Sequence, residues 1–384
     1  VYFISWGSGM SVLYSYILIP FFYLFGSSVF VLRLPQALGG ILACYIFYRI
    51  LRLFWGKRDA LIGFFIVGIM PWGIMSSRFG MDANLLPLFY LLGFYFYLRA
   101  LKCSNYIFLS AIFYGLAMYA YASSWIFVII SMLFQYAYWL YFKHNKNDVL
   151  VVFVALCVFG ILFAPLFLLY LINSGYMEEI RTSFFSIPKL IYWRDNEIGF
   201  NNFGLKFSAL VNVLIKQNDF MYHNCIPEFG LFYHISLPLI VVGLFILIKH
   251  SIADLKANVF SFSFVILINV LFGVIYAFML YSNINRINYL WYFIIFSIVV
   301  GILSCNTKVQ WGVLFIYFVL FALAISIVVP VAWVFMASVK ENSEFYGNPW
   351  TLPLGFHWQN FVDAWNAAQM GDYMINSVIV TALA

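Results

Sequence analysis

The stretch RLPQALGGILACYIFYRILRLFWGKRDALIGFFIVGIMPWGIMSSRFGMDANLLPLFYLLGFYFYLRAL, from Arg33 to Leu101, decides the fold. It contains most of one apolar run, at about 28–48, and all of two others, at about 60–76 and 84–101. A basic turn separates the first two runs, and a short polar turn separates the last two. Each run approaches the roughly 20 apolar residues that a helix needs to cross a bilayer. The stretch therefore predicts consecutive transmembrane helices joined by short loops.

The composition of the whole chain supports the same conclusion. Charged residues number 34 of 384 (20 Lys and Arg plus 14 Asp and Glu), or 9%, and hydrophobic residues make up 65%. Soluble globular proteins carry about 25% charged residues. This composition excludes a water-soluble enzyme, a disordered chain and a nucleic-acid-binding protein. We predict an all-α, polytopic helical membrane protein whose surroundings are membrane lipid.

Apolar runs continue along the chain and predict about ten transmembrane helices, with the start of an eleventh at 374–384. The ten runs lie at about 28–48, 60–76, 84–101, 105–121, 124–142, 149–172, 231–248, 258–281, 287–304 and 312–338. One set of alternate loops carries eleven Lys and Arg residues, whereas the short loops of the other set carry three. Because cytoplasmic loops are enriched in Lys and Arg, the first set is predicted inside. The long loop at 173–230 is then extracytoplasmic.

The first 27 residues contain an apolar segment, 8–26, that this topology places outside. The span that follows starts on the outer side, so the segment cannot cross the membrane and return. We expect a helix lying in the membrane interface, and the end of a truncated span is the alternative. The chain begins at Val1 without a visible signal peptide, and it ends inside an apolar run, which suggests a fragment.

Metal chemistry is not indicated. The five cysteines show no CxxC spacing, and His223 and His234 stand eleven residues apart without a third ligand suited to zinc. We expect no metal and no cofactor.

Several segments, in order, resemble a known family. The Arg33–Leu101 stretch combines Arg-Leu-Pro at the start of a span, a basic turn, then Pro-Trp, Ser-Arg and Asp-Ala-Asn before the next span. It resembles the family 39 membrane glycosyltransferases of the C superfamily, which include protein O-mannosyltransferases and the lipid A aminoarabinose transferase. WGSGMSVLYSYILIPFFYLFG, FSIPKLIYWRDNEIGF, YHNCIPEFGLFYHISLPLIVVGL and NINRINYLW look like further segments of its bacterial members. The resemblance covers about residues 1–304.

The resemblance implies an activity and a place for it. Family members transfer a sugar from a polyprenyl-phosphate donor to an acceptor on the extracytoplasmic face. The catalytic base is usually an acid in the first outer loop, which would lie upstream of Val1, and residues 1–27 contain no acid. The chain as given is therefore expected to be inactive alone. The lipid-linked sugar would be its substrate, in the plasma membrane of a bacterium.

Two residues match the second outer loop of the family. Arg78 could bind the donor phosphate, and Asp82, four residues later, could position the donor or the acceptor. The alternative is a structural ion pair in which Asp82 favours the N-terminus of the 84–101 helix.

Two other outer loops carry candidate residues. Arg286, the only charge in NINRIN, could reach a pyrophosphate-like headgroup, or it could be a snorkelling anchor. We expect Arg78, Asp82 and Arg286 to converge on one outward-facing cavity. Charged residues in the 173–230 loop could line the acceptor side, although a solvated surface is the simpler interpretation; they are Lys189, Arg194, Asp195 and Glu197.

The C-terminal part, 305–384, has a different character. Pro330, Trp333, Ser338 and Lys340, then NPWTLP, NFVDAWN and Asn376-Ser377, resemble the start of a carbohydrate ABC-transporter permease. An ATPase and a sugar-binding protein would be its partners if this part works. No GxxxxGK[ST] motif occurs in the chain, so no nucleotide site is expected. We therefore divide the chain into an interfacial segment, 1–27, a glycosyltransferase-like domain, 28–304, and a permease-like fragment, 305–384. A chimera joined near 304–312 is the preferred explanation, and a real fusion is the alternative.

Overall fold

The computed structural model describes most of the chain. The described residues are 2–5, 8–143, 145–183, 186–191, 193, 198–199, 201–221, 223–308, 331, 333–347, 351, 353–368 and 370–383. The chain divides into two compact units, residues 1–301 (with 383–384) and residues 302–382.

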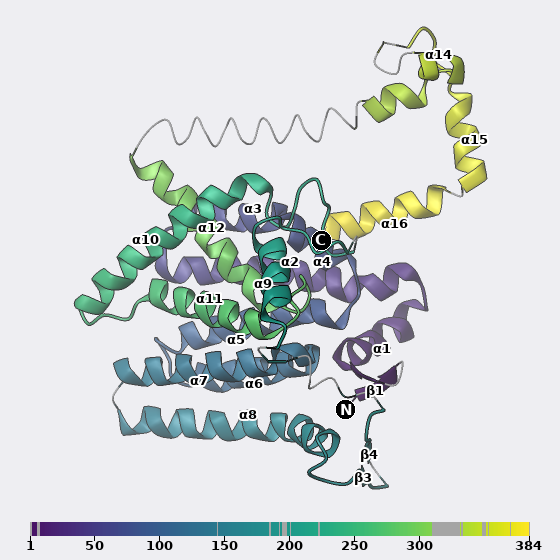
Figure 1. Cartoon of the computed structure of the whole chain (residues 1–384). Coiled ribbons are helices and arrows are strands. Elements are labelled where there is room, and N and C mark those ends of the chain that lie inside the picture. The colour runs from purple at the N-terminus through teal and green to yellow at the C-terminus, as the bar shows by residue number, and fades with distance from the viewer. Residues whose placement is uncertain are drawn as a thin grey trace. The chain divides into compact units, whose positions relative to one another are not determined.

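The first unit is built from helices (Figure 1). They are α1 (Leu13–Phe25), α2 (Val29–Phe54), α3 (Lys57–Ile69), α4 (Pro71–Arg78), α5 (Leu86–Arg99), α6 (Tyr106–Ala120), α7 (Trp125–Phe142), α8 (Lys146–Asn173), α9 (Phe203–Leu214), α10 (Leu237–Lys256), α11 (Phe262–Met279) and α12 (Trp291–Lys308). Short 3-10 helices precede four of the longer ones: η1 (Asp82–Leu85), η2 (Ala122–Ser124), η4 (His234–Ser236) and η5 (Asn288–Leu290). The strands among the described residues form two small hairpins, β1–β2 (Tyr2–Ser5 and Ser8–Ser11) and β3–β4 (Ile180–Arg181 and Ser186–Ile187).

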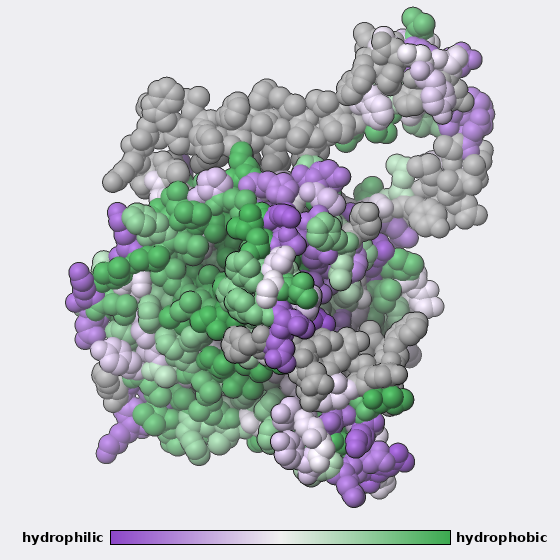
Figure 2. Space-filling view, in the orientation of Figure 1, coloured by the Kyte–Doolittle hydropathy of each residue, from purple (hydrophilic) through white to green (hydrophobic). Residues whose placement is uncertain are grey.

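The predicted fold class, an all-α polytopic membrane protein, is confirmed. Each of the first nine predicted runs coincides with a helix or a pair of helices. Among the described residues, five helices are long and apolar enough to cross a membrane, and the bent pair α3–α4 makes a sixth candidate. Figure 2 shows the apolar surface over α8, α10 and α11, with hydrophilic residues toward the ends of these helices.

The predicted span at 60–76 is broken in the middle. Helices α3 and α4 meet at an angle of 57° around Met70. Pro71 begins α4, where its missing N–H leaves no hydrogen bond unmade and its ring prevents α3 from continuing straight. The bend leads directly to Arg78 and to the η1 turn.

Aromatic side chains from α2, α5 and α12 pack against one another in the first unit. The rings of Phe47 (α2) and Phe296 (α12) stack at 4.2 Å between centroids, and those of Phe94 (α5) and Phe293 (α12) meet edge to face at 5.3 Å. Helices α10 and α12 approach so closely that a Cβ on Gly243 would clash with the carbonyl oxygen of Ser297. Such close approach between helices in a membrane requires a residue without a side chain.

A buried polar network lies inside the same helix bundle. Asn269 of α11 accepts hydrogen bonds through Oδ1 from Tyr90 Oη at 2.6 Å, Ser131 Oγ at 2.7 Å and Gln135 Nε2 at 3.1 Å. Tyr114 donates to Gln135 Oε1, and Asn269 donates to the carbonyl of Val265 at 2.7 Å. The network joins α5, α6, α7 and α11 away from lipid, where polar groups need partners.

The N-terminal segment differs in part from the predicted interfacial helix. Residues 8–11 form strand β2, paired with β1, and the helix starts only at Leu13. In α1, Tyr14 and Leu18 are buried, whereas Tyr23 and Leu24 are exposed. An apolar face turned outward suits a helix in the membrane interface, which stays a prediction.

The second unit contains α14 (Asn342–Gly347), α15 (Gln359–Ala368) and α16 (Met370–Leu383). Asn360 ties the start of α15 to residues 338–340, which precede α14, because its Nδ2 donates to the carbonyls of Ser338 at 3.0 Å and Lys340 at 2.9 Å. Most of the tenth predicted span, residues 309–330, lies outside the described residues, whereas residues 374–383 of the predicted eleventh span lie in α16.

Candidate functional site

Asp82 lies in a half-buried turn between α4 and α5. It is the first residue of η1, and its Oδ1 accepts a hydrogen bond from the backbone N–H of Ala83 at 2.8 Å. Burial raises the pKa of Asp82, and interactions with backbone groups of Ala83 and Ser11 oppose this rise only in part. The turn is held from α2, since Gln36 Nε2 donates to the carbonyl of Asn84 at 3.0 Å. Asp82 is thus a partly desolvated acid in a fixed turn.

Arg78 ends α4, four residues before Asp82, and its side chain is half-buried. Within the described part of the chain it forms no ion pair with Asp82, and the ion pair found there joins Arg181 and Glu179. The alternative prediction of a structural ion pair between Arg78 and Asp82 is therefore wrong. The same alternative also placed Asp82 at the N-terminus of the 84–101 helix, and Asp82 does lie at the N-terminus of η1, which leads into α5.

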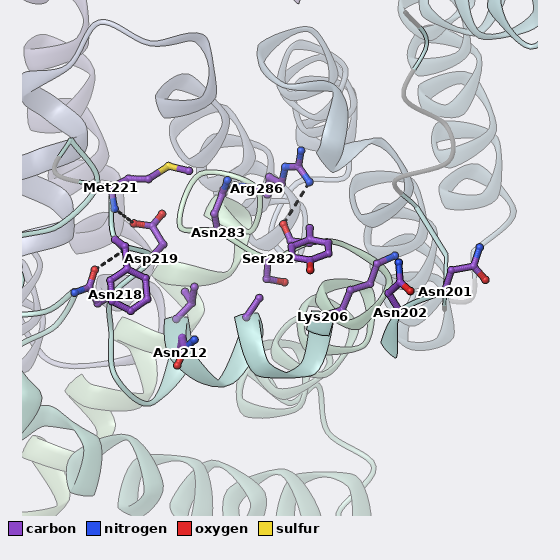
Figure 3. A pocket seen from close by; sticks show the side chains of 14 residues that line it. Asn201, Asn202, Lys206, Asn212, Asn218, Asp219, Met221, Ser282, Asn283 and Arg286 are labelled. Carbon is purple, nitrogen blue, oxygen red and sulfur yellow. Dashed lines mark hydrogen bonds between the residues drawn. The ribbon is translucent and has the colours of Figure 1, made fainter. Parts of the chain in front are cut away.

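Arg286 lines a cavity of about 600 Å³ in the first unit (Figure 3). One wall is α9 with the residues on either side of it, and the other is the loop 281–286. The guanidinium Nη1 of Arg286 donates to the carbonyl of Tyr281 at 3.4 Å, and its backbone N–H donates to Asn283 Oδ1 at 2.8 Å. These bonds fold the loop so that it borders the cavity.

Two charged groups of the cavity wall are engaged in holding it together. Lys206 of α9 is 3% exposed, and its Nζ donates to the carbonyls of Gly199 at 2.8 Å and Met279 at 3.0 Å. Asp219 accepts through Oδ2 from the backbone N–H of Ile284 at 3.0 Å and from Asn224 Nδ2 at 2.6 Å. Both side chains thus fasten the segment 199–219 to the end of α11 and to the loop that follows it.

The loop that contains Arg286 is also joined to the Asp82 turn. Asn288, just after that loop, donates from Nδ2 to the carbonyl of Ala83 at 3.0 Å and accepts at Oδ1 from Trp72 Nε1 at 3.1 Å. Asn288 is 0% exposed. One buried amide therefore links α4, η1 and η5, and it holds the Asp82 turn next to the NINRIN loop.

The predicted convergence of three residues on one cavity stays a prediction. The lining of the 600 Å³ cavity includes Arg286 but neither Arg78 nor Asp82. Of the four predicted acceptor-side residues, Lys189 is exposed, and Arg194, Asp195 and Glu197 lie outside the described residues. His223 packs edge to face against Phe79, with ring centroids 6.3 Å apart.

Sequence reasoning missed the asparagines that line the cavity. Asn201, Asn202 and Asn212 border it from α9 and its approach. Scattered asparagines in a loop follow no sequence motif, so no signal in the sequence pointed to them. Among the described residues, no three His, Cys, Asp or Glu side chains form a cluster suited to a metal ion.

Comparison with a family model and with solved structures supports the resemblance of the first segment. Residues 10–184 match the family described as dolichyl-phosphate-mannose-protein mannosyltransferase. The crystal structure of ArnT from Cupriavidus metallidurans in the apo state is similar with a TM-score of 0.53 and 15% identity, over 90% of this chain and 57% of ArnT. The fold is thus that of a polytopic membrane protein like ArnT, and the resemblance to membrane glycosyltransferases is confirmed.

Two curated permeases support the resemblance of the C-terminal segment. The probable ABC transporter permease protein YurM of Bacillus subtilis is 40% identical over 73 residues, which are 19% of this chain and 22% of YurM. The diacetylchitobiose uptake system permease protein NgcG of Streptomyces coelicolor is 38% identical over 61 residues, 16% of this chain and 20% of NgcG. The chain spans about a fifth of the length of these relatives. Both resemblances predicted from the sequence are present in one chain.

Proposed function

We propose that the first unit is the membrane domain of a glycosyltransferase that takes a sugar from a polyprenyl-phosphate donor on the extracytoplasmic face. The family match over residues 10–184 and the ArnT-like fold support the membrane glycosyltransferase class. The single observation that carries the donor assignment is Arg286 at the border of a large cavity, on a loop joined through Asn288 to the Asp82 turn.

The charges of these outer loops suit the proposed reaction. A phosphate leaving group gains negative charge as the sugar departs, and a nearby guanidinium stabilises it. Arg286 takes this role, with Arg78 as a second cation at the end of α4. Asp82, a carboxylate in a partly desolvated turn, positions the donor or the acceptor. The base that removes the acceptor proton belongs to the first outer loop of the family.

The proposed setting follows from the substrate. A polyprenyl chain must enter the site from the bilayer, so the protein works in a membrane, and we propose the plasma membrane of a bacterium. The partners of this unit are membrane lipid and the lipid-linked sugar. The reaction itself requires no metal and no further cofactor.

Transfer of label from a polyprenyl-phosphate sugar into membrane material tests this function. The chain is joined behind the first span and outer loop of a family member that carries an outer Asp. The joined protein is expected to transfer label, and the same protein with that outer Asp replaced by Asn is the inactive control. Absence of donor-dependent transfer in the joined, folded protein contradicts the proposal.

A second candidate function rests on the C-terminal segment. Its 40% identity with YurM over 73 residues favours a carbohydrate ABC-transporter permease, whose partners are an ATPase and a sugar-binding protein. We propose that the chain is a chimera joined near residues 304–312, with a real fusion as the alternative. Long-read sequencing across the codons for 300–315 tests this, because an uninterrupted frame carrying both complete proteins contradicts the chimera.

A further inference from the structure

The cavity beside Arg286 has free hydrogen-bonding groups of one chemical kind. Asn201, Asn202 and Asn212 all line it. Within the described part of the chain, none of their side-chain amides has a hydrogen-bond partner, and Asn202 makes no side-chain cap at the start of α9. Each primary amide offers two donors and one acceptor oxygen with two lone pairs. Three such groups together can satisfy a ligand that is rich in hydroxyl groups.

The charged groups of the same wall do not compete for this role. Lys206 is directed to two backbone carbonyls, and both carboxylate oxygens of Asp219 accept hydrogen bonds from the protein. The polar groups that the α9 side presents to the cavity are therefore the neutral asparagine amides. An uncharged group is favoured at the α9 wall, because Lys206 and Asp219 are already engaged within the protein, whereas Arg286 lies on the opposite wall.

Aromatic rings complete the lining. Phe220 and Tyr281 both border the cavity and are 72% and 45% exposed. A ring face presented beside amides suits a pyranose, which has C–H groups on its faces and hydroxyls around its edge. The volume of about 600 Å³ lies within the roughly 300–1,000 Å³ of small-molecule sites and can hold more than one sugar ring.

The other face of α9 is apolar. Phe203 and Phe207 are 51% and 48% exposed, and both stack on Phe278 near the end of α11, with ring centroids at 5.8 and 6.0 Å. Since α11 is a candidate span, this face of α9 is suited to the membrane interface. The cavity therefore stands on a helix where a lipid headgroup can reach it.

We propose that this cavity binds an uncharged sugar unit, with the amides of Asn201, Asn202 and Asn212 on its hydroxyls. The inference rests on the proposed function and extends it, because it places a sugar beside Arg286 and the phosphate of the donor. The sugar belongs either to the headgroup of a membrane glycolipid or to a soluble glycan. Both sources present the same hydroxyl chemistry.

Saturation-transfer NMR on the full chain in nanodiscs tests the site. The probes are methyl α-D-mannopyranoside and methyl β-D-glucopyranoside, and the protein is prepared without maltoside or glucoside detergents, whose headgroups carry the same chemistry. At least one glycoside is expected to receive saturation. Asn212→Leu and Asn201→Ala should each weaken its binding by about tenfold, as expected for a lost hydrogen bond to the ligand.

The matched control is Asn147→Leu, at an exposed position in the first turn of α8. This variant should bind the glycoside like the wild type, and the thermal unfolding of all variants shows that they are folded. Nanodiscs that contain glucosyldiacylglycerol distinguish the sources: competition with the glycoside indicates a lipid headgroup, and unchanged binding indicates a soluble glycan.

Two results overturn the site. One is that neither glycoside receives saturation, and the other is that binding persists in folded Asn212→Leu and Asn201→Ala proteins. The proposed function is measured separately, by label transfer from the polyprenyl-phosphate donor. Transfer that continues while glycoside binding is absent overturns the sugar site alone.

Discussion

Trp72 and Asn288 are 216 residues apart in the sequence, yet the indole Nε1 of Trp72 donates a hydrogen bond to Oδ1 of Asn288 at 3.1 Å. The same amide donates from Nδ2 to the carbonyl of Ala83, the residue after Asp82. Both side chains are buried, so water cannot replace either bond. Asn288 is therefore the residue through which the Arg286 loop and the Asp82 turn keep a fixed relation.

Replacing Asn288 should damage this relation. Asn288→Ala leaves Trp72 Nε1 and the Ala83 carbonyl buried without these partners, at a cost of about 1–3 kcal/mol for each unsatisfied group. The apparent Tm in nanodiscs should fall, and proteolysis in the 79–85 segment should accelerate. Asn105→Ala, at an exposed position before α6, is the control and should change neither. Equal stability of the two variants would show that the hydrogen bonds of Asn288 to Trp72 and Ala83 do not stabilise the fold.

The buried network around Asn269 gives a second prediction about stability. Asn269→Ala removes the acceptor shared by Tyr90, Ser131 and Gln135. Hydrogen bonds between membrane helices contribute about 0.6 kcal/mol each on average, so the loss should be about 2 kcal/mol and should lower the apparent Tm. Ile275→Ala, on the same helix and 48% exposed, should lower it much less. A smaller effect at Asn269 than at Ile275 contradicts a stabilising network.

The pH dependence of stability should report on Asp82. Its pKa is raised in the folded protein because burial disfavours the charged carboxylate. The folded state then holds the proton more tightly than the unfolded chain, so stability from Asp82 is present at low pH and lost as the pH rises above the ordinary Asp value of about 3.9. Asp82→Asn should therefore gain apparent Tm relative to the wild type as the pH rises from about 4 to about 7.

The control for this experiment is Glu228→Gln, because Glu228 is exposed. Its difference from the wild type should stay nearly constant with pH. If the Asp82→Asn difference is equally flat, the carboxylate is not desolvated in the protein. Reduced label transfer in Asp82→Asn, together with its higher stability, is the combination expected for a functional acid held in an unfavourable environment.

The topology is tested by labelling from outside the cell. Single cysteines introduced at positions 195, 285 and 350 of a cysteine-free variant should react with a membrane-impermeant maleimide, and those at 57, 145 and 252 should not. The eleven-to-three difference in Lys and Arg between the two sets of loops motivates this expectation. Labelling at 145 in intact cells would invert the orientation and place Asp82 inside.

Much of the fold could be predicted because hydropathy determines which segments enter a membrane. The runs at 124–142 and 149–172 coincide almost residue for residue with α7 and α8. The sequence did not reveal that the 60–76 run bends by 57°, although Pro71 stands at the break. A proline in an apolar run predicts a kink or an end, and only packing against α2 decides between them.

The candidate site was harder to predict, for physical reasons. Arg286 was identified because a lone charge in an apolar sequence is conspicuous. Its cavity depends on Lys206 and Asp219, which contact residues more than 60 positions away, and no local pattern encodes such contacts. Asn201, Asn202 and Asn212 carry no charge and follow no spacing, so their common position became evident only from the folded chain.

The most direct test of the central claim is sugar transfer by Arg286→Ala in the protein joined behind a family first span with an outer Asp. Label from a polyprenyl-phosphate sugar is followed in sealed vesicles, with Arg52→Ala, at an exposed position on the predicted inner side, as the control. Loss of a charged hydrogen bond to the phosphate, about 1.5–3 kcal/mol, predicts transfer about ten- to a hundredfold slower in Arg286→Ala and unchanged in Arg52→Ala. Equal transfer by folded Arg286→Ala and wild-type proteins would contradict the assignment of Arg286 to the donor phosphate.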